Sequence, residues 1–157
     1  KDNLVEVYKD GNNIKARANM LATSSMGSIA FQKGLGAIHS LSHPIGAIYN
    51  THHGLTNAVF MPYVLVRNKE AIENKILDLS RYLNLSNPSF NSFLDWILDL
   101  RKSLSIPHTL KELIEDDSNF EKMSVMALND PSTASNPIKL YEKDFLKLYQ
   151  NSYEGIL

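Results

Sequence analysis

The sequence contains no cysteine, which excludes disulfides, thiolate metal sites and thiol nucleophiles and suits a reducing compartment. It also has no excess of positive charge, because 16 Lys and Arg residues against 17 Asp and Glu residues give a net charge of −1. The longest apolar run, 58–66, contains a proline and is too short to span a bilayer. We therefore expect a cytoplasmic protein with no nucleic-acid partner and no membrane association.

Length and composition suit one globular unit. The chain has 157 residues, of which 43% are hydrophobic and 21% charged, values close to those of average globular proteins. A chain of this length can bury a core of its own. We therefore treat residues 1–157 as a single domain.

Hydrophobic spacing predicts an all-α fold of about seven helices, because no stretch alternates with period two for long enough to indicate a strand. Prolines at positions 44 and 62 stand inside or near these segments, and we expect the first to disturb its helix. In the first long helix, five residues at a spacing of three to four predict a buried face: Ala16, Met20, Ser24, Gly27 and Phe31. The expected helices are 14–32, one from about 36, 53–66, 69–84, 90–104, 110–114, 119–129 and 143–153.

Charge is distributed unevenly along the chain. Between Arg17 and Arg67, Lys33 is the only residue with a formal charge. Such a block is typical of a protein interior or of a surface that another domain covers. The same block holds four of the five histidines, at positions 39, 43, 52 and 53.

The spacing of these histidines indicates where their side chains can meet. His39 and His43 are four residues apart and project from one face of a helix, and His53 follows after a turn that can bring its imidazole back toward them. Converging imidazoles in an apolar setting suit zinc or iron(II). The alternative is that each is a buried histidine bonded to the backbone. No Glu lies among them, so the H-E-x-x-H pattern of a helical metalloprotease is missing.

Several motifs together resemble one family over essentially the whole chain. They are R-x-x-M (Arg17, Met20), G-x-x-x-F (Gly27, Phe31), GLG-x-x-H-x-x-x-H-P-x-G (34–46), HG-x-x-N-A (53–58), and D-P-S-T (130–133) followed by Asn136-Pro137. This pattern is similar to the iron-containing, or group III, alcohol dehydrogenases. The resemblance implies the multi-helix C-terminal domain of the dehydroquinate-synthase-like fold, here a metal-binding domain.

The resemblance also implies an activity and its residues. Members are two-domain enzymes more than twice this length, which interconvert alcohols with aldehydes or ketones by hydride transfer. Their N-terminal domain binds NAD or NADP, and one Asp and three His hold a divalent metal, Fe²⁺ or Zn²⁺, in the cleft between the domains. By position, His39 and His53 are metal ligands, and His43 is a catalytic residue beside the nicotinamide and a small alcohol or aldehyde substrate. The other two ligands belong to an upstream segment, so we expect this chain to need the N-terminal domain and to be inactive alone. We also expect a homo-oligomer.

Two other functions fit the residues. The chain can be an isolated, non-catalytic helical fragment whose charge-poor block serves only packing or dimerisation. It can also be a small zinc hydrolase that uses His39, His43 and His53 as three ligands.

Overall fold

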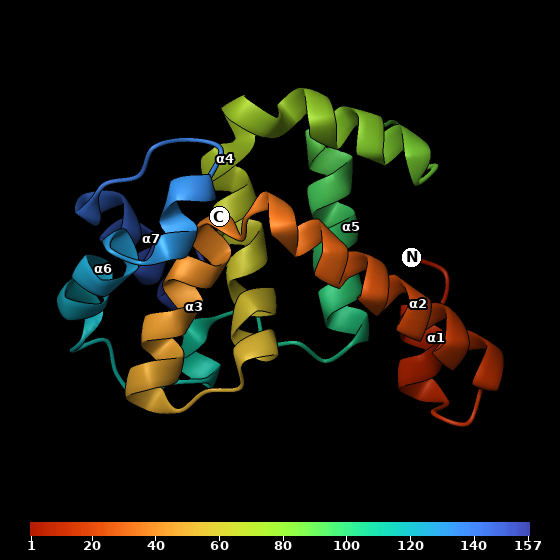
Figure 1. Ribbon diagram of the computed structural model, residues 1–157, viewed down its shortest axis with the longest axis horizontal. Helices are drawn as coiled ribbons and strands as arrows, with labels where there is room; N and C mark the ends of the chain where they lie inside the picture. Colours follow the sequence, from red (N-terminus) through yellow and green to blue (C-terminus); the bar gives the residue numbers. More distant parts are fainter.

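The computed structural model describes residues 1–157 and contains only helices and connecting segments (Figure 1), so the predicted all-α fold is confirmed. The α-helices are α1 (Leu4–Lys9), α2 (Ile14–Ala30), α3 (Gly36–Tyr49), α4 (His53–Tyr82), α5 (Phe90–Ser103), α6 (Phe120–Leu128) and α7 (Glu142–Glu154). Three short 3-10 helices lie between them: η1 (Phe31–Lys33), η2 (Leu110–Glu112) and η3 (Pro131–Ser135). No helix combines the length and the apolar character that crossing a membrane requires.

Local sequence signals explain where several helices begin and end. The Asn13 side chain accepts a hydrogen bond from the Ala16 amide and caps α2, as its position before the apolar spacing predicts. Ser89 and Ser92 cap α5 reciprocally. Asn50 adopts the left-handed conformation, with φ of 53°, and ends α3. This turn sends the chain back along α3 into α4.

The expected disturbance of the helix at Pro44 and the expected helix boundary between residues 66 and 69 are both wrong. The segments expected as separate helices, 53–66 and 69–84, form the single helix α4, which contains Pro62. Likewise α3 continues through Pro44. Both prolines are buried, so tertiary packing outweighs the loss of one backbone hydrogen bond. Figure 1 shows that α4 changes direction along its length, and a proline is the usual cause of such a bend.

The predicted buried face of α2 is also wrong. Of its five residues only Ala16 is buried, and Ser24 and Phe31 are exposed. The reason is that α2 runs away from the rest of the chain (Figure 1) and packs mainly against α1, a short helix the spacing did not predict, and η1. Large apolar side chains on α2 are therefore exposed, among them Ile14, Leu21, Met26 and Ile29.

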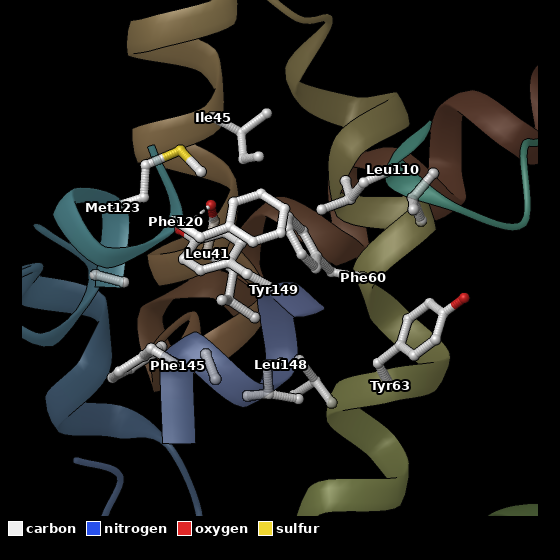
Figure 2. Packing of buried hydrophobic residues seen from close by; sticks show 14 of the residues in the cluster. Leu41, Ile45, Phe60, Tyr63, Leu110, Phe120, Met123, Phe145, Leu148 and Tyr149 are labelled. Atoms are coloured by element: carbon white, nitrogen blue, oxygen red, sulfur yellow. Dashed lines mark hydrogen bonds between the residues drawn. The ribbon is translucent and has the colours of Figure 1, made fainter. Parts of the chain in front are cut away.

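The main core lies where α3, α4, α6 and α7 meet (Figure 2). Aromatic rings fill its centre, with Tyr149 stacked on Phe120 and edge-on to Phe60. The Tyr149 hydroxyl donates to the Leu41 carbonyl at 2.8 Å, which satisfies a buried polar group and fixes α7 against α3. A second, smaller cluster joins α4 to α5 through Ile76, Phe90, Phe93 and Ile97.

The segment around η3 is tied to the start of α3, nearly 100 residues earlier. The Gly36 amide donates to the Ser135 hydroxyl at 3.0 Å, and the Ala37 amide donates to the Asn136 side chain at 3.2 Å. Gly34 has φ of 108°, and a Cβ there would overlap Ser135, so only glycine allows this close approach. These contacts fix η3, and Asp130 just before it, beside α3.

Candidate functional site

The structure brings three histidines together where α3 faces the start of α4. His39 and His43 lie one turn apart on α3, and His53 is the first residue of α4 after the turn at Asn50. The ring centres of His39 and His53 are 5.2 Å apart, those of His43 and His53 5.4 Å, and those of His39 and His43 5.9 Å. The predicted hairpin therefore places the three imidazoles in one cluster.

The side-chain amide of Asn57 lies between two of these rings. Its nitrogen Nδ2 is 3.2 Å from Nε2 of His39 and 3.0 Å from Nε2 of His53. An amide nitrogen can only donate, so in this arrangement both Nε2 atoms accept from Asn57, whereas Nδ1 of His39 and Oδ1 of Asn57 are buried without a hydrogen-bond partner. In His53, Nδ1 lies 3.4 Å from the Ser42 hydroxyl. The Nε2 atoms of His39 and His53 thus converge on one point beside Asn57.

His43 has a different environment. Its Nδ1 lies 2.7 Å from Oδ2 of Asp130, the residue just before η3. The histidine side chain is 43% exposed, whereas that of Asp130 is only 12% exposed. The other carboxylate oxygen of Asp130 accepts a hydrogen bond from the Ser132 amide at 2.8 Å. His43 is therefore half open to solvent, and its inner nitrogen is held by a charged partner.

The pKa values of His39 and Asp130 are both lowered at this site, for different physical reasons. Burial lowers the pKa of His39, and its neighbours His53 and His43 lower it further, against smaller opposing effects from the Leu35 carbonyl and Asp130. Burial acts to raise the pKa of Asp130, but its hydrogen bonds with His43 and Ser132 outweigh burial and lower it. At neutral pH, His39 is therefore a neutral imidazole and Asp130 a carboxylate.

The lowered pKa of His39 predicts a pH dependence of stability. Because the unfolded chain binds a proton at the usual value of 6.5 and the folded chain only at lower pH, the unfolded state holds more protons in this window. The free energy of unfolding should therefore fall as pH drops from 7.5 toward 5.5. Urea denaturation followed by circular dichroism measures this. In His39→Gln the decline should be shallower, and an unchanged decline would contradict the assignment.

His52, the fourth histidine of the block, has a structural place. Its Nδ1 accepts a hydrogen bond from the Leu55 amide at 3.2 Å, so it caps the start of α4. His108 lies apart, against the ring of Tyr63.

The chain does not form a complete metal site by itself. No three of its His, Asp or Glu side chains are arranged to hold a metal ion, which argues against a self-contained zinc site made of three histidines. The donor set of His39 and His53 nevertheless fits part of a site for zinc or iron(II), because two imidazole Nε2 atoms converge in a setting poor in charge. The remaining ligands would have to come from outside this chain.

The site residues that sequence reasoning missed are the partners of the histidines. Asp130 belongs to the D-P-S-T motif and Asn57 to HG-x-x-N-A, but nothing in the spacing links them to the imidazoles. Ser42 lies beside His43 in the sequence and faces His53 in space.

Comparison with known proteins agrees with the fold and the motifs. Residues 1–153 match the Fe-containing alcohol dehydrogenase family, C-terminal. Among curated proteins, 1,3-propanediol dehydrogenase of Citrobacter freundii is 30% identical, and the match covers 96% of this chain and 41% of that protein. Alcohol dehydrogenase 4 of Saccharomyces cerevisiae is 28% identical over 98% of this chain and 41% of its own length.

Solved structures show the same relationship. The crystal structure of a 1,3-propanediol oxidoreductase superposes with a TM-score of 0.91 at 28% identity, covering 96% of this chain and 41% of that one. An alcohol dehydrogenase from Oenococcus oeni gives 0.89 at 27% identity, with the same coverage. The chain thus spans about two fifths of the length of the relatives that it matches.

Proposed function

Because the chain belongs to the C-terminal part of the iron-containing alcohol dehydrogenase family, we propose that it supplies the helical half of the metal site in an NAD(P)-dependent alcohol dehydrogenase. The observation that carries this proposal is the convergence of the His39 and His53 Nε2 atoms on one point, with His43 beside them. Two ligands from this chain and two from elsewhere would complete the set that the family resemblance implies. The chain alone would then be inactive.

The substrate class follows from the relatives. Curated relatives include 1,3-propanediol dehydrogenase, 4-hydroxybutyrate dehydrogenase of Cupriavidus necator and lactaldehyde reductase of Escherichia coli, whose names all refer to small oxygenated molecules. We propose a small alcohol or aldehyde as substrate. An NADPH-dependent butanol dehydrogenase of Clostridium saccharobutylicum is also among them, and the nicotinamide nucleotide would bind mainly to the part of the enzyme outside this chain.

The chain's own residues have distinct tasks in this mechanism. His39 and His53 would hold the metal through Nε2 as neutral imidazoles, each with its proton on Nδ1. A metal held by these two residues would supply Lewis-acid polarisation of the alcohol oxygen. His43 is half exposed beside these ligands, so its Nε2 is free to exchange a proton with the substrate hydroxyl.

The native polypeptide that contains this chain tests the proposal. Its mass should be more than twice 17.7 kDa, and the purified protein should contain a divalent metal and oxidise small alcohols such as 1,3-propanediol with NAD or NADP. A native product of 17.7 kDa, or a longer one that binds neither metal nor nucleotide, would overturn it.

Replacing His43 with alanine separates its role from that of a ligand. In the native enzyme, His43→Ala should lower kcat by roughly 10²–10⁴-fold, the usual contribution of a general acid or base, while the metal content stays near that of the wild type. Steady-state kinetics and elemental analysis measure the two effects. If His43→Ala lost the metal, His43 would be a ligand and the roles assigned here would be wrong.

A non-catalytic packing domain is the second candidate, and the exposed apolar side chains of α2 favour it. Ile14, Leu21, Met26 and Ile29 are each at least 69% exposed, a pattern typical of a surface that another domain or subunit covers. In the dehydrogenase proposal, the rest of the polypeptide packs there. Nucleotide binding distinguishes the dehydrogenase from the packing domain, because a packing domain in its native form would bind neither NAD(H) nor NADP(H).

A further inference from the structure

Asp130 is the charged group in direct contact with the candidate proton-transfer residue. We propose that Asp130 is a positioning residue, which holds His43 with its proton on Nδ1 and so leaves the Nε2 lone pair free to accept the substrate's hydroxyl proton. This inference rests on the proposed dehydrogenase function and adds to it a residue whose carboxylate acts through His43.

The contact between His43 and Asp130 determines which ring nitrogen of His43 carries the proton. Nδ1 of His43 and Oδ2 of Asp130 are 2.7 Å apart, a distance typical of a charge-assisted hydrogen bond. An ionised carboxylate only accepts hydrogen bonds, so His43 must donate from Nδ1. In a neutral imidazole the other nitrogen is then an acceptor. The contact therefore selects one of the two neutral forms of the ring, the one that can take a proton at Nε2.

Several contacts hold Asp130 in place beside α3. Its Oδ1 accepts from the Ser132 amide at 2.8 Å, which fixes the carboxylate at the start of η3. The Thr133 hydroxyl lies 2.7 Å from that of Ser40, on the same helix as His43. With the bonds of Ser135 and Asn136 to the start of α3, these contacts join η3 to α3 at several points. Asp130 thus keeps its position relative to His43, although 87 residues separate them in sequence.

In the proposed reaction the alcohol loses one proton and one hydride, and each has a defined acceptor. During alcohol oxidation the O–H bond breaks and its proton moves to Nε2 of His43, while the C–H bond electrons leave as hydride to the oxidised nicotinamide. The products are the carbonyl compound, the reduced nicotinamide and an imidazolium. Asp130 stabilises that imidazolium as an ion pair through Nδ1–H, as the carboxylate of a serine-protease triad does for its histidine. Because His43 is 43% exposed, the proton can then pass to solvent.

Two matched substitutions test this role. Asp130→Asn preserves the size of the side chain and an oxygen that can accept from Ser132, but it presents an NH₂ group that can only donate to His43. Donation to Nδ1 moves the ring proton to Nε2, the form that cannot accept a proton there. Asp116→Asn is the control, since Asp116 Oδ1 accepts from the Ser118 amide at 3.0 Å in the same local arrangement, away from the histidine cluster.

The first measurement determines, on the full chain, which ring nitrogen of His43 carries the proton. Long-range ¹H–¹⁵N correlation spectra of ¹⁵N-histidine-labelled protein distinguish Nδ1–H from Nε2–H, and the missing signal in His43→Gln assigns the resonance. We expect Nδ1–H in the wild type and in Asp116→Asn, and Nε2–H in Asp130→Asn. The wild-type spectrum is informative even if Asp130→Asn fails to fold, because Nε2–H in the wild type would overturn the inference.

Kinetics of the native enzyme complete the test. Asp130→Asn should lower kcat by at least tenfold while KM for the alcohol and the metal content stay near wild-type values, and Asp116→Asn should change none of them. An unchanged kcat in Asp130→Asn would overturn the inference and leave the dehydrogenase proposal standing. A wild-type enzyme that turns over no alcohol with either nucleotide would overturn the proposed function itself, whatever the proton position of His43.

Discussion

Replacing His39 or His53 with alanine is expected to remove the metal and the alcohol dehydrogenase activity together from the native enzyme. Each substitution deletes one Nε2 donor of the pair that converges beside Asn57. Outer-shell partners of metal ligands alone contribute about 10–100-fold to metal affinity, so the loss of a ligand should weaken binding by more than about 100-fold. Elemental analysis after gel filtration and the rate of NAD(P)H formation measure the two losses.

His52→Asn is the matched control for this experiment. It also removes an imidazole from the same block, but asparagine keeps an acceptor for the Leu55 amide that His52 caps. The variant should keep its metal and its activity. Retention of the metal in His53→Ala, or an equal loss in His52→Asn, would contradict the assignment of ligands.

Replacing Leu41 with alanine is expected to lower the free energy of unfolding of the chain by about 3 kcal/mol, within the range measured for leucine truncations in protein cores. Leu41 is fully buried in the main core, between His39 and His43 in the sequence, where α3 packs against α4 and α6. Because domains of this kind are stable by only about 5–15 kcal/mol, the loss should be large. Urea denaturation followed by circular dichroism measures it.

Leu21→Ala makes the same chemical change at a different position. Leu21 is 69% exposed on α2, so its truncation in the isolated chain should change stability by less than about 0.5 kcal/mol. If both variants lost the same stability, the core described at α3 would be wrong. If Leu41→Ala were as stable as the wild type, the packing of α3 into the main core would be wrong.

The sequence predicted most of the helices because their signals are local. Apolar spacing placed α2, α5, α6 and α7 to within a few residues. The errors came from nonlocal packing. A buried proline within a helix costs about 3 kcal/mol or more locally, and only the burial of Pro62 and Pro44 within the fold explains why α4 and α3 continue through them.

The candidate site was predictable in its histidines but not in their partners. The i, i+4 spacing of His39 and His43 and the turn before His53 suffice to bring the rings together. Asp130 reaches His43 only because Gly34 lets η3 approach the start of α3, and no local pattern encodes that approach. The exposed apolar side chains of α2 have a similar origin, since local sequence does not indicate which surface covers them.

The most direct test of the proposed metal site is an anomalous difference map from crystals of the native enzyme, recorded at the absorption edge of its metal. We predict one peak about 2.0–2.1 Å from Nε2 of both His39 and His53, with Nδ1 of His43 still bonded to Asp130. A peak bound to His43, or the absence of any peak at the three imidazoles in an enzyme that contains metal, would contradict it.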